Sequence, residues 1–291
     1  MSAVPLLSER ALGSGARILH VGWSTTRKLF FPVLGFVAIV GIWQLSIGLT
    51  HIPSYIVPRP TDVARATLNA PGLLWSGVLT TAAAAAAGLL LAVVIGVAGA
   101  TCLAFSAVVE RSLFPYAIVL QTTPVIAIAP LVVIWFGANI RSIIVIVFLI
   151  SFFPMLSNTL VGLHSPDPDM RGLFRLYKAS PMKTMLKLRV PGSVPYIMAG
   201  LKIAGGLSVI GAIVAEYVAG VGGGQGGLGY LIAVSAQQLN TPYLVAAALC
   251  GSLLGLIFFG AVAIASKALA TRHDPGAEAE VRGGITGRVG G

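Results

Sequence analysis

The side chains that most often carry chemistry are scattered along this chain. The sequence contains no His-Glu-x-x-His and no Gly-x-Ser-x-Gly pattern, and Cys102 and Cys250 fall in apolar stretches without metal-ligand spacing. A catalytic site needs such groups to converge, so the sequence argues against an enzyme. The four histidines are spread over separate polar segments: His20, His51, His164 and His273.

Nucleotide-binding patterns are absent or out of place. The segment 222–229 contains Gly-x-Gly-x-x-Gly twice, but no strand precedes it, so we interpret it as a flexible loop before a short helix starting at Tyr230. A Walker loop needs glycine directly before lysine, and no lysine in this chain follows glycine. We therefore expect no cofactor in this chain, and any ATP and Mg²⁺ must be bound by a partner.

The composition is that of a membrane protein. Hydrophobic residues make up 56% of the chain and charged residues 10%, and the mean hydropathy is +0.92. A helix needs about 20 mostly apolar residues to cross the hydrocarbon layer of a bilayer. We therefore predict an all-α membrane protein with six transmembrane helices. The qualifying stretches are 29–49, 78–105, 115–136, 142–163, 196–219 and 243–266.

The basic residues predict the orientation of these spans. With a cytoplasmic N-terminus, 15 of the 19 Lys and Arg residues fall in cytoplasmic segments, three fall in outside loops, and Lys202 lies within a span near its cytoplasmic end. The net charge of +10 thus indicates orientation and not nucleic-acid binding, and both termini are expected in the cytoplasm. We expect a cytoplasmic tail at 1–28, a transmembrane domain at 29–268 with a cytoplasmic loop at 164–195, and a disordered tail at 269–291.

Few polar groups lie at membrane depth, and each has two interpretations. Glu216, near the outer end of the fifth span, is either a pathway or gate residue or an interfacial cap, since burying a charge is costly. The others either line the pathway or make interhelical hydrogen bonds. These candidates are Gln121, Thr122 and Thr123 beside Pro124, and Asn158 in the fourth span. On the outer side, a short interfacial helix is expected at 62–77.

The loop 164–195 predicts two short amphipathic helices. Asp167-Pro168 is a helix start, and the helix to about 179 places Met170, Leu173, Phe174 and Tyr177 on one stripe. Ser180-Pro181 repeats the start signal, and Pro191 is expected to end the second helix. The loop carries six basic and two acidic residues, net +4. It is either an interfacial hairpin on anionic lipid or a docking surface for a partner.

Residues 174–180 and 188–203, with Leu-Arg-Val-Pro-Gly at 188–192, resemble the EAA loop of binding-protein-dependent ABC importer permeases, closest to the nitrate/sulfonate/taurine group. Segments 56–63 and 210–217 resemble that group's first outside loop and fifth span, so that the resemblance covers about 30–268. The chain departs from the family at Gly172, where the family has glutamate, and at Lys178, where it has glycine. The glutamate's ion pair is therefore not implied here, whereas helix-in-groove docking is.

The resemblance implies the type I ABC importer architecture in the bacterial inner membrane. Two permease copies would pair, each would hold one ATP-binding subunit through the 168–190 loop, and an external solute-binding protein would deliver the solute. The group carries nitrate, alkanesulfonates, taurine and bicarbonate, and relatives import pyrimidine thiamine precursors or riboflavin-like heterocycles. The implied ATPase-coupling residues are Leu173, Phe174, Arg175, Tyr177, Lys178, Ala179, Ser180, Pro181 and Met182. The alternative class is a stand-alone secondary transporter, which would need coupling-ion carboxylates within the spans.

Overall fold

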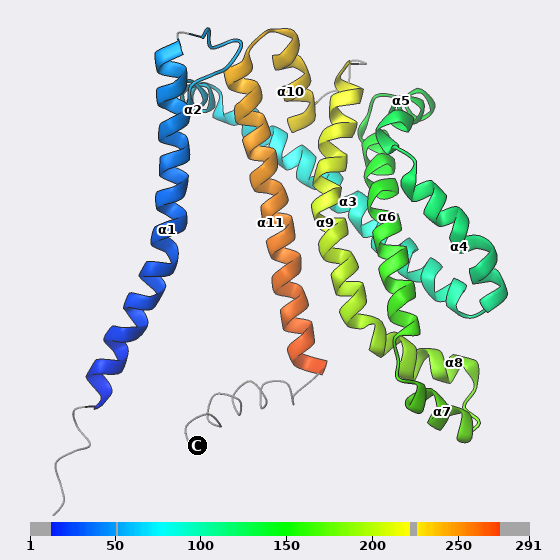
Figure 1. The fold of residues 1–291 in the computed structure, drawn as a ribbon. Helices are drawn as coiled ribbons and strands as arrows, with labels where there is room; N and C mark the ends of the chain where they lie inside the picture. The colour runs from blue at the N-terminus through cyan, green and yellow to red at the C-terminus, as the bar shows by residue number, and fades with distance from the viewer. Residues whose placement is uncertain (1–12, 51, 222–225, 274–291) are drawn as a thin grey trace, which may run out of the picture.

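The computed structural model describes residues 13–50, 52–221 and 226–273, and helices are the only regular elements within them. Figure 1 shows long helices running between two ends of the molecule. The elements are α1 (Gly13–Thr50), α2 (Pro60–Asn69), α3 (Pro71–Ala104), α4 (Ala107–Thr122), α5 (Val125–Phe136), α6 (Ile140–His164), α7 (Pro168–Leu176), α8 (Pro181–Thr184), the π-helix η1 (Met185–Arg189), α9 (Val190–Val221), α10 (Leu228–Gln237) and α11 (Thr241–His273).

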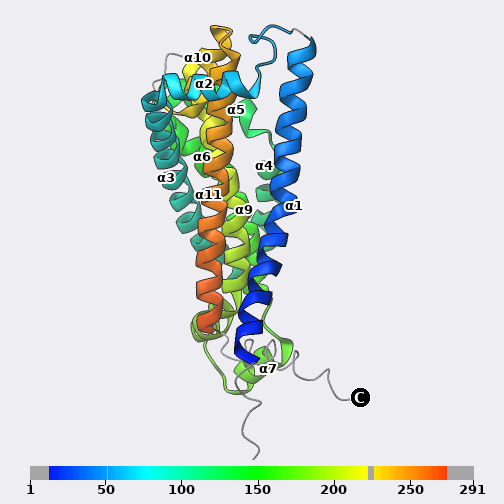
Figure 2. The same cartoon turned by 90° about the vertical axis from the view of Figure 1, so that its left-hand side faces the viewer.

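The two ends of the molecule carry different short elements. Helices α7 and α8 lie at one end, with the start of α1 and the end of α11 (Figures 1 and 2). Helices α2 and α10 lie at the other end. We call these the α7–α8 end and the α2–α10 end. The start of α1, the 164–195 loop and the end of α11, which are all expected on the cytoplasmic side from their basic residues, therefore share one end of the structure.

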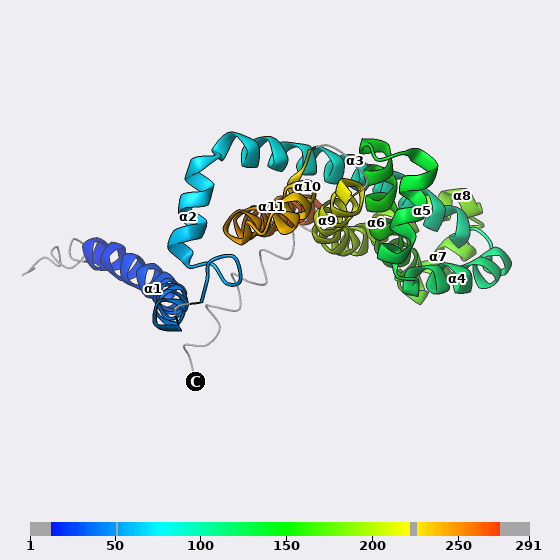
Figure 3. The same ribbon diagram turned by 90° about the horizontal axis from the view of Figure 1, so that it is seen from above.

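The core is a row of three helices with a fourth along its side. Seen from above, α11, α9 and α6 stand in a row, α3 follows one side of it, and α1 stands apart (Figure 3). Glycines allow α3 to approach α6 closely: a Cβ on Gly88 would lie 2.4 Å from Val147 Cγ1, and one on Gly96 would lie 2.9 Å from Met155 Cβ. Small residues along α3 thus let its backbone pack closely against α6.

The predicted spans are present, with one difference. In the part of the chain that the structure describes, five helices are long and apolar enough to cross a membrane, within α1, α3, α6, α8–α9 and α11. The third predicted span, 115–136, is not one straight helix, because α4 and α5 meet at 92° at Thr123 and Pro124. Pro124 offers no N–H to continue the helix and disfavours the helical conformation at Thr123 before it. Counted as one broken span, this pair makes the sixth.

Three predicted boundaries shift in the structure. The outer helix expected at 62–77 ends at Asn69, and α3 starts at Pro71, where proline suits the first turn of a helix. Helix α1 begins at Gly13, within the expected tail 1–28, so the predicted boundary marks where the helix becomes apolar. Helix α11 continues to His273, past the expected end of the domain at 268, and residues 274–291 of the predicted tail lie outside the described residues.

Candidate functional site

Helix α7 has both of its predicted sequence signals at its start. The Asp167 carboxylate Oδ1 accepts a hydrogen bond from the Asp169 N–H at 2.8 Å, and Pro168 occupies the first helical position. One N–H without a helical partner is thus satisfied, and the proline has none to satisfy. The predicted start of the loop's first helix is confirmed.

The end of α7 is a Schellman turn built without glycine. The Ala179 N–H donates to the Phe174 carbonyl at 3.0 Å, and the Lys178 N–H donates to the Arg175 carbonyl at 2.9 Å. Lys178 has a φ of 49°, in the left-handed region that favours glycine. This geometry explains why the resembling family has glycine at this position. The left-handed residue also ends α7 at Leu176, three residues before the predicted end.

The second half of the loop runs without a break into the core helix α9. The Ser180 hydroxyl caps α8 by accepting from the Lys183 N–H at 3.3 Å, as predicted. The prediction that Pro191 ends this segment is wrong, because η1 passes directly into α9 at Val190. The wide turn of η1 comes just before Pro191, which then takes the second position of α9, where its missing N–H costs little. Helix α8, η1 and α9 therefore form one continuous element.

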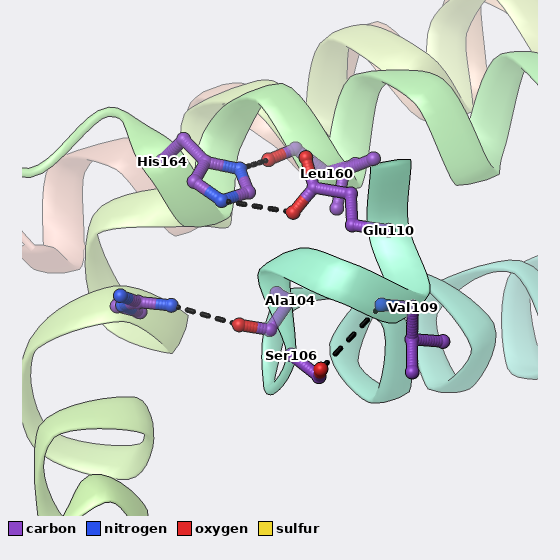
Figure 4. A network of polar contacts seen from close by, with 7 residues as sticks. Ala104, Ser106, Val109, Glu110, Leu160 and His164 are labelled. Atoms are coloured by element: carbon purple, nitrogen blue, oxygen red, sulfur yellow. Dashed lines mark hydrogen bonds and ion pairs between the residues drawn. The ribbon is translucent and has the colours of Figure 1, made fainter. Parts of the chain in front are cut away.

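Two side chains hold η1 against the core. Met185 is buried in a cluster with Ala100, Leu160 and Leu163 from α3 and α6. The Arg189 guanidinium Nη1 donates to the carbonyl of Ala104, at the end of α3, at 3.0 Å (Figure 4). This helix end would otherwise present a carbonyl without a partner. The loop is therefore anchored to α3 by both a buried thioether and a charged donor.

Helix α4 is tied to α6 next to this anchor. Figure 4 shows the His164 ring between two oxygens: Nε2 lies 3.3 Å from Glu110 Oε2, and Nδ1 lies 2.9 Å from the Leu160 carbonyl. The Ser106 hydroxyl caps α4 by accepting from the Val109 N–H at 3.4 Å. Polar contacts thus fix the relative positions of α3, α4, α6 and η1 at the α7–α8 end.

The predicted apolar stripe of α7 divides into two faces. Phe174 is half-buried and lines a cavity of about 400 Å³ with Arg171, Arg175, Glu110 and His164. Tyr177 is 77% exposed, on the face turned away from the helices. The apolar residues that this loop leaves exposed are Met170, Leu173, Leu176, Tyr177, Met182 and Leu186.

Leu176 was missed by the sequence analysis. It is 79% exposed and lies beside Tyr177 at the end of α7. At helical spacing, Leu176 lies outside the predicted apolar stripe of the helix. Helix α7 ends early, at Leu176. The sign of this early end in the sequence is Lys178, which stands where the resembling family has glycine. The exposed apolar face at the end of α7 therefore consists of Leu173, Leu176 and Tyr177 and excludes Phe174.

Two of the candidate pathway residues at the end of α4 make hydrogen bonds within their own helix. At the bend between α4 and α5, the Thr122 and Thr123 hydroxyls donate to the Val119 carbonyl of their own helix at 2.8 and 3.2 Å. The predicted interhelical bonds are therefore not formed by these two hydroxyls. Gln121 is exposed and lies one residue earlier. These three residues lie together at a broken span, where a polar side chain is accessible.

Asn158 and Glu216 are placed differently from each other. The Asn158 amide donates to the Pro154 carbonyl at 2.8 Å, and its Cβ would lie 2.9 Å from a Cβ on Gly200 of α9, so it marks the α6–α9 contact. Glu216 is only 1% exposed and therefore lines no open path in this structure. Its carboxylate contacts Thr81 of α3 and the start of α10. Sequence spacing gave no sign of Thr81, which lies 135 residues away.

The fold of this chain is found in a known transporter. It resembles one chain in the crystal structure of an amino acid ABC transporter with histidines, with a TM-score of 0.54 and 16% sequence identity. The match covers 69% of this chain and 96% of that chain. The two chains therefore share a fold.

Sequence comparison then gives the family. Residues 88–271 match the family described as binding-protein-dependent transport system inner membrane component, and the chain belongs to this family. The formylaminopyrimidine transport permease protein ThiX of Halalkalibacterium halodurans is 34% identical over 79% of this chain and 91% of its own length.

Two further relatives carry other names. The riboflavin transport system permease protein RibX of Chloroflexus aurantiacus is 30% identical, over 80% of this chain and 88% of its own length. The putative aliphatic sulfonates transport permease protein SsuC of Escherichia coli is 31% identical, over 78% and 84%. The chain is thus a multi-pass inner-membrane permease of a binding-protein-dependent ABC importer, which confirms the resemblance found in the sequence.

Proposed function

We propose that this permease imports a small solute by coupling to a separate ATPase at its α7–α8 end. The observation that carries the proposal is the exposed apolar face of α7, formed by Leu173, Leu176 and Tyr177, on a loop fixed by two N-caps and by Arg189. A preordered helix end with apolar side chains suits insertion into a groove of a partner, because little ordering entropy remains to be lost. Basic residues around it favour an acidic partner surface.

The proposed assembly contains two copies of this chain and two ATP-binding subunits, which bind ATP and Mg²⁺. In this arrangement the α7–α8 end faces the cytoplasm, in agreement with the positions of the basic residues. The α2–α10 end faces the external solute-binding protein. ATP-driven closure of the ATPases would draw the two α7 helices together and reorient the spans.

We call the exposed apolar face formed by Leu173, Leu176 and Tyr177 the coupling face of α7. Assembly of the permease with the ATPase tests this face directly. Leu176→Asp and Tyr177→Asp place a carboxylate on the face that docks, and we expect at least a tenfold loss of co-purified ATPase, in the range of an interface hot spot of about 2 kcal/mol. Leu176→Met and Tyr177→Phe keep the apolar surface and serve as matched controls. If both Asp variants retain the ATPase at the level of their controls, the docking face lies elsewhere.

The proposed cargo is either a small oxyanion, such as a sulfonate, nitrate or bicarbonate, or a nitrogen heterocycle. Relatives include a sulfonate permease on one side and formylaminopyrimidine and riboflavin permeases on the other. The 34% identity to the formylaminopyrimidine permease favours the heterocycle. Calorimetry of the cognate binding protein with formylaminopyrimidine, riboflavin, taurine, nitrate and bicarbonate separates them. Binding of taurine or nitrate, and of neither heterocycle, would reverse that preference.

A further inference from the structure

Glu216 is the centre of a buried polar cluster that joins three helices. The Thr81 hydroxyl of α3 donates to Glu216 Oε2 of α9 at 2.8 Å, and the Gly229 N–H of α10 donates to the same oxygen at 2.9 Å. The Leu228 N–H donates in turn to Thr81 Oγ1 at 2.8 Å. We call Thr81, Glu216, Leu228 and Gly229 the Glu216 clamp. Its hydrogen-bonded partners lie up to 147 residues apart in sequence.

The Glu216 clamp satisfies the start of α10. The first N–H groups of a helix have no partner within the helix, and in a buried position each needs one from elsewhere. Leu228 and Gly229 are the first two residues of α10, and their N–H groups find the Thr81 hydroxyl and the Glu216 carboxylate. A negatively charged or strongly accepting group at this position also suits the helix dipole. The Glu216 carboxylate of α9 therefore caps the start of α10, where the residue before the helix, Gly227, has no side chain to do so.

Glycines bring the start of α10 into direct contact with α9. A Cβ on Gly229 would lie 2.0 Å from the Ile213 carbonyl oxygen, and one on Gly227 would lie 2.2 Å from Glu216 Cδ. Gly227 also has a φ of 87°, which other residues rarely adopt. No side chain separates the α10 backbone from the carboxylate. The contact is therefore rigid, since interfaces packed this closely do not deform continuously.

The Glu216 clamp lies on the element that begins at the coupling loop. Helix α9 runs unbroken from η1, and Glu216 lies near its other end. Next to the clamp, α10 forms one wall of a cavity of about 670 Å³ at the α2–α10 end, which Arg65, Asn69, Gln238 and Tyr243 also line. A movement of α9 can therefore reach the wall of this cavity through α10, which packs directly against α9.

We propose that the Glu216 clamp makes α10 move with α9 and α3, so that displacement of the coupling loop reshapes the cavity at the α2–α10 end. Glu216 and Thr81 are positioning residues in this proposal, and they contact no solute. The proposal rests on the proposed function for the source of the displacement. The polar bonds themselves are a separate claim, which is tested on the permease alone.

The first test uses Thr81→Val, which keeps the shape of the side chain and removes its hydroxyl, with Thr81→Ser as the matched control. Hydrogen–deuterium exchange of the peptide containing Leu228 and Gly229 is measured on the purified permease. We expect about tenfold faster exchange in Thr81→Val, because both hydrogen bonds of the Thr81 hydroxyl are lost, including the one that the Leu228 N–H donates. Exchange in Thr81→Ser should be nearly unchanged, because the hydroxyl is kept. Equal exchange in the two variants would show that the clamp does not hold α10.

The second test asks whether the Glu216 clamp transmits movement. A Gln238→Cys reporter, with Cys102 and Cys250 replaced, is labelled with an impermeant maleimide in the assembled transporter, without nucleotide and after trapping with ATP and vanadate. We expect the labelling rate to change by at least about fivefold between the states with Thr81 or Thr81→Ser, and to stay constant with Thr81→Val. The amount of trapped nucleotide should remain equal in all three.

Each failure identifies a different claim. A constant labelling rate in the parent, or an unchanged response in Thr81→Val, overturns the transmission proposal while the coupling face of α7 stands. Failure of the parent to assemble with any ATPase overturns the proposed function, and the exchange experiment still decides whether the Glu216 clamp holds α10.

Discussion

At the scale of the residue, Lys178 adopts a backbone conformation that suits glycine better than lysine. Its φ of 49° costs a residue with a Cβ roughly 1 kcal/mol relative to glycine. We therefore expect Lys178→Gly to stabilise the end of α7 by about 1 kcal/mol, measured as slower amide exchange at Ala179, whose N–H closes the turn. Arg175→Gly, within the helix, should do the opposite, and stabilisation by both would contradict the left-handed geometry.

Gly172 is a second residue whose replacement is expected to stabilise α7. It lies inside α7, and a Cβ there would meet nothing within 4 Å. Gly172→Ala should therefore stabilise α7 by about 0.5 to 1 kcal/mol, because glycine in a helix loses more backbone entropy on folding. Amide exchange across 170–177 measures the effect. Loss of ATPase binding in this variant would show that the bare backbone at Gly172 is itself part of the docking face.

At the scale of the element, the contact of α3 with α6 depends on missing side chains. A Cβ on Gly88 would overlap Val147 at 2.4 Å, whereas Gly72 of the same helix has open space around it. We expect Gly88→Ala to lower stability by about 1 to 3 kcal/mol, the usual cost of overpacking, and Gly72→Ala to leave it nearly unchanged. Thermal unfolding in detergent compares them. Equal unfolding temperatures for the two variants would show that α6 can move away from α3 without loss of stability.

The elements also show which predictions sequence can support. The N-caps at Asp167 and Ser180 were predictable because a cap is local: the acceptor lies two or three residues from the donor. Pro191 was misread because a proline ends a helix or begins one, and only the preceding π-turn decides which. The Glu216 clamp was out of reach, since nothing local links Thr81 to a carboxylate 135 residues later. Span positions followed from apolar length, but the 92° bend did not.

At the scale of the whole molecule, the two ends should lie on opposite sides of the membrane. Asn240, at the α2–α10 end, and Lys183, at the α7–α8 end, are both exposed. With the native cysteines replaced, we expect Asn240→Cys to react with an impermeant maleimide in intact cells and Lys183→Cys only after permeabilisation. The reverse pattern would invert the proposed orientation and place the coupling face of α7 outside the cell.

The length of α9 has a mechanical consequence. Its 32 residues measure about 48 Å, well beyond the roughly 30 Å of hydrocarbon in a bilayer. Glu216 lies about 39 Å along this rod from Val190, by a rise of 1.5 Å per residue. If α9 pivoted at η1, a tilt of about 5° would displace the carboxylate by about 3.4 Å, slightly more than the donor–acceptor distance of a hydrogen bond. Because α9 is so long, a small rotation at the loop would produce a large displacement at the other end of the helix.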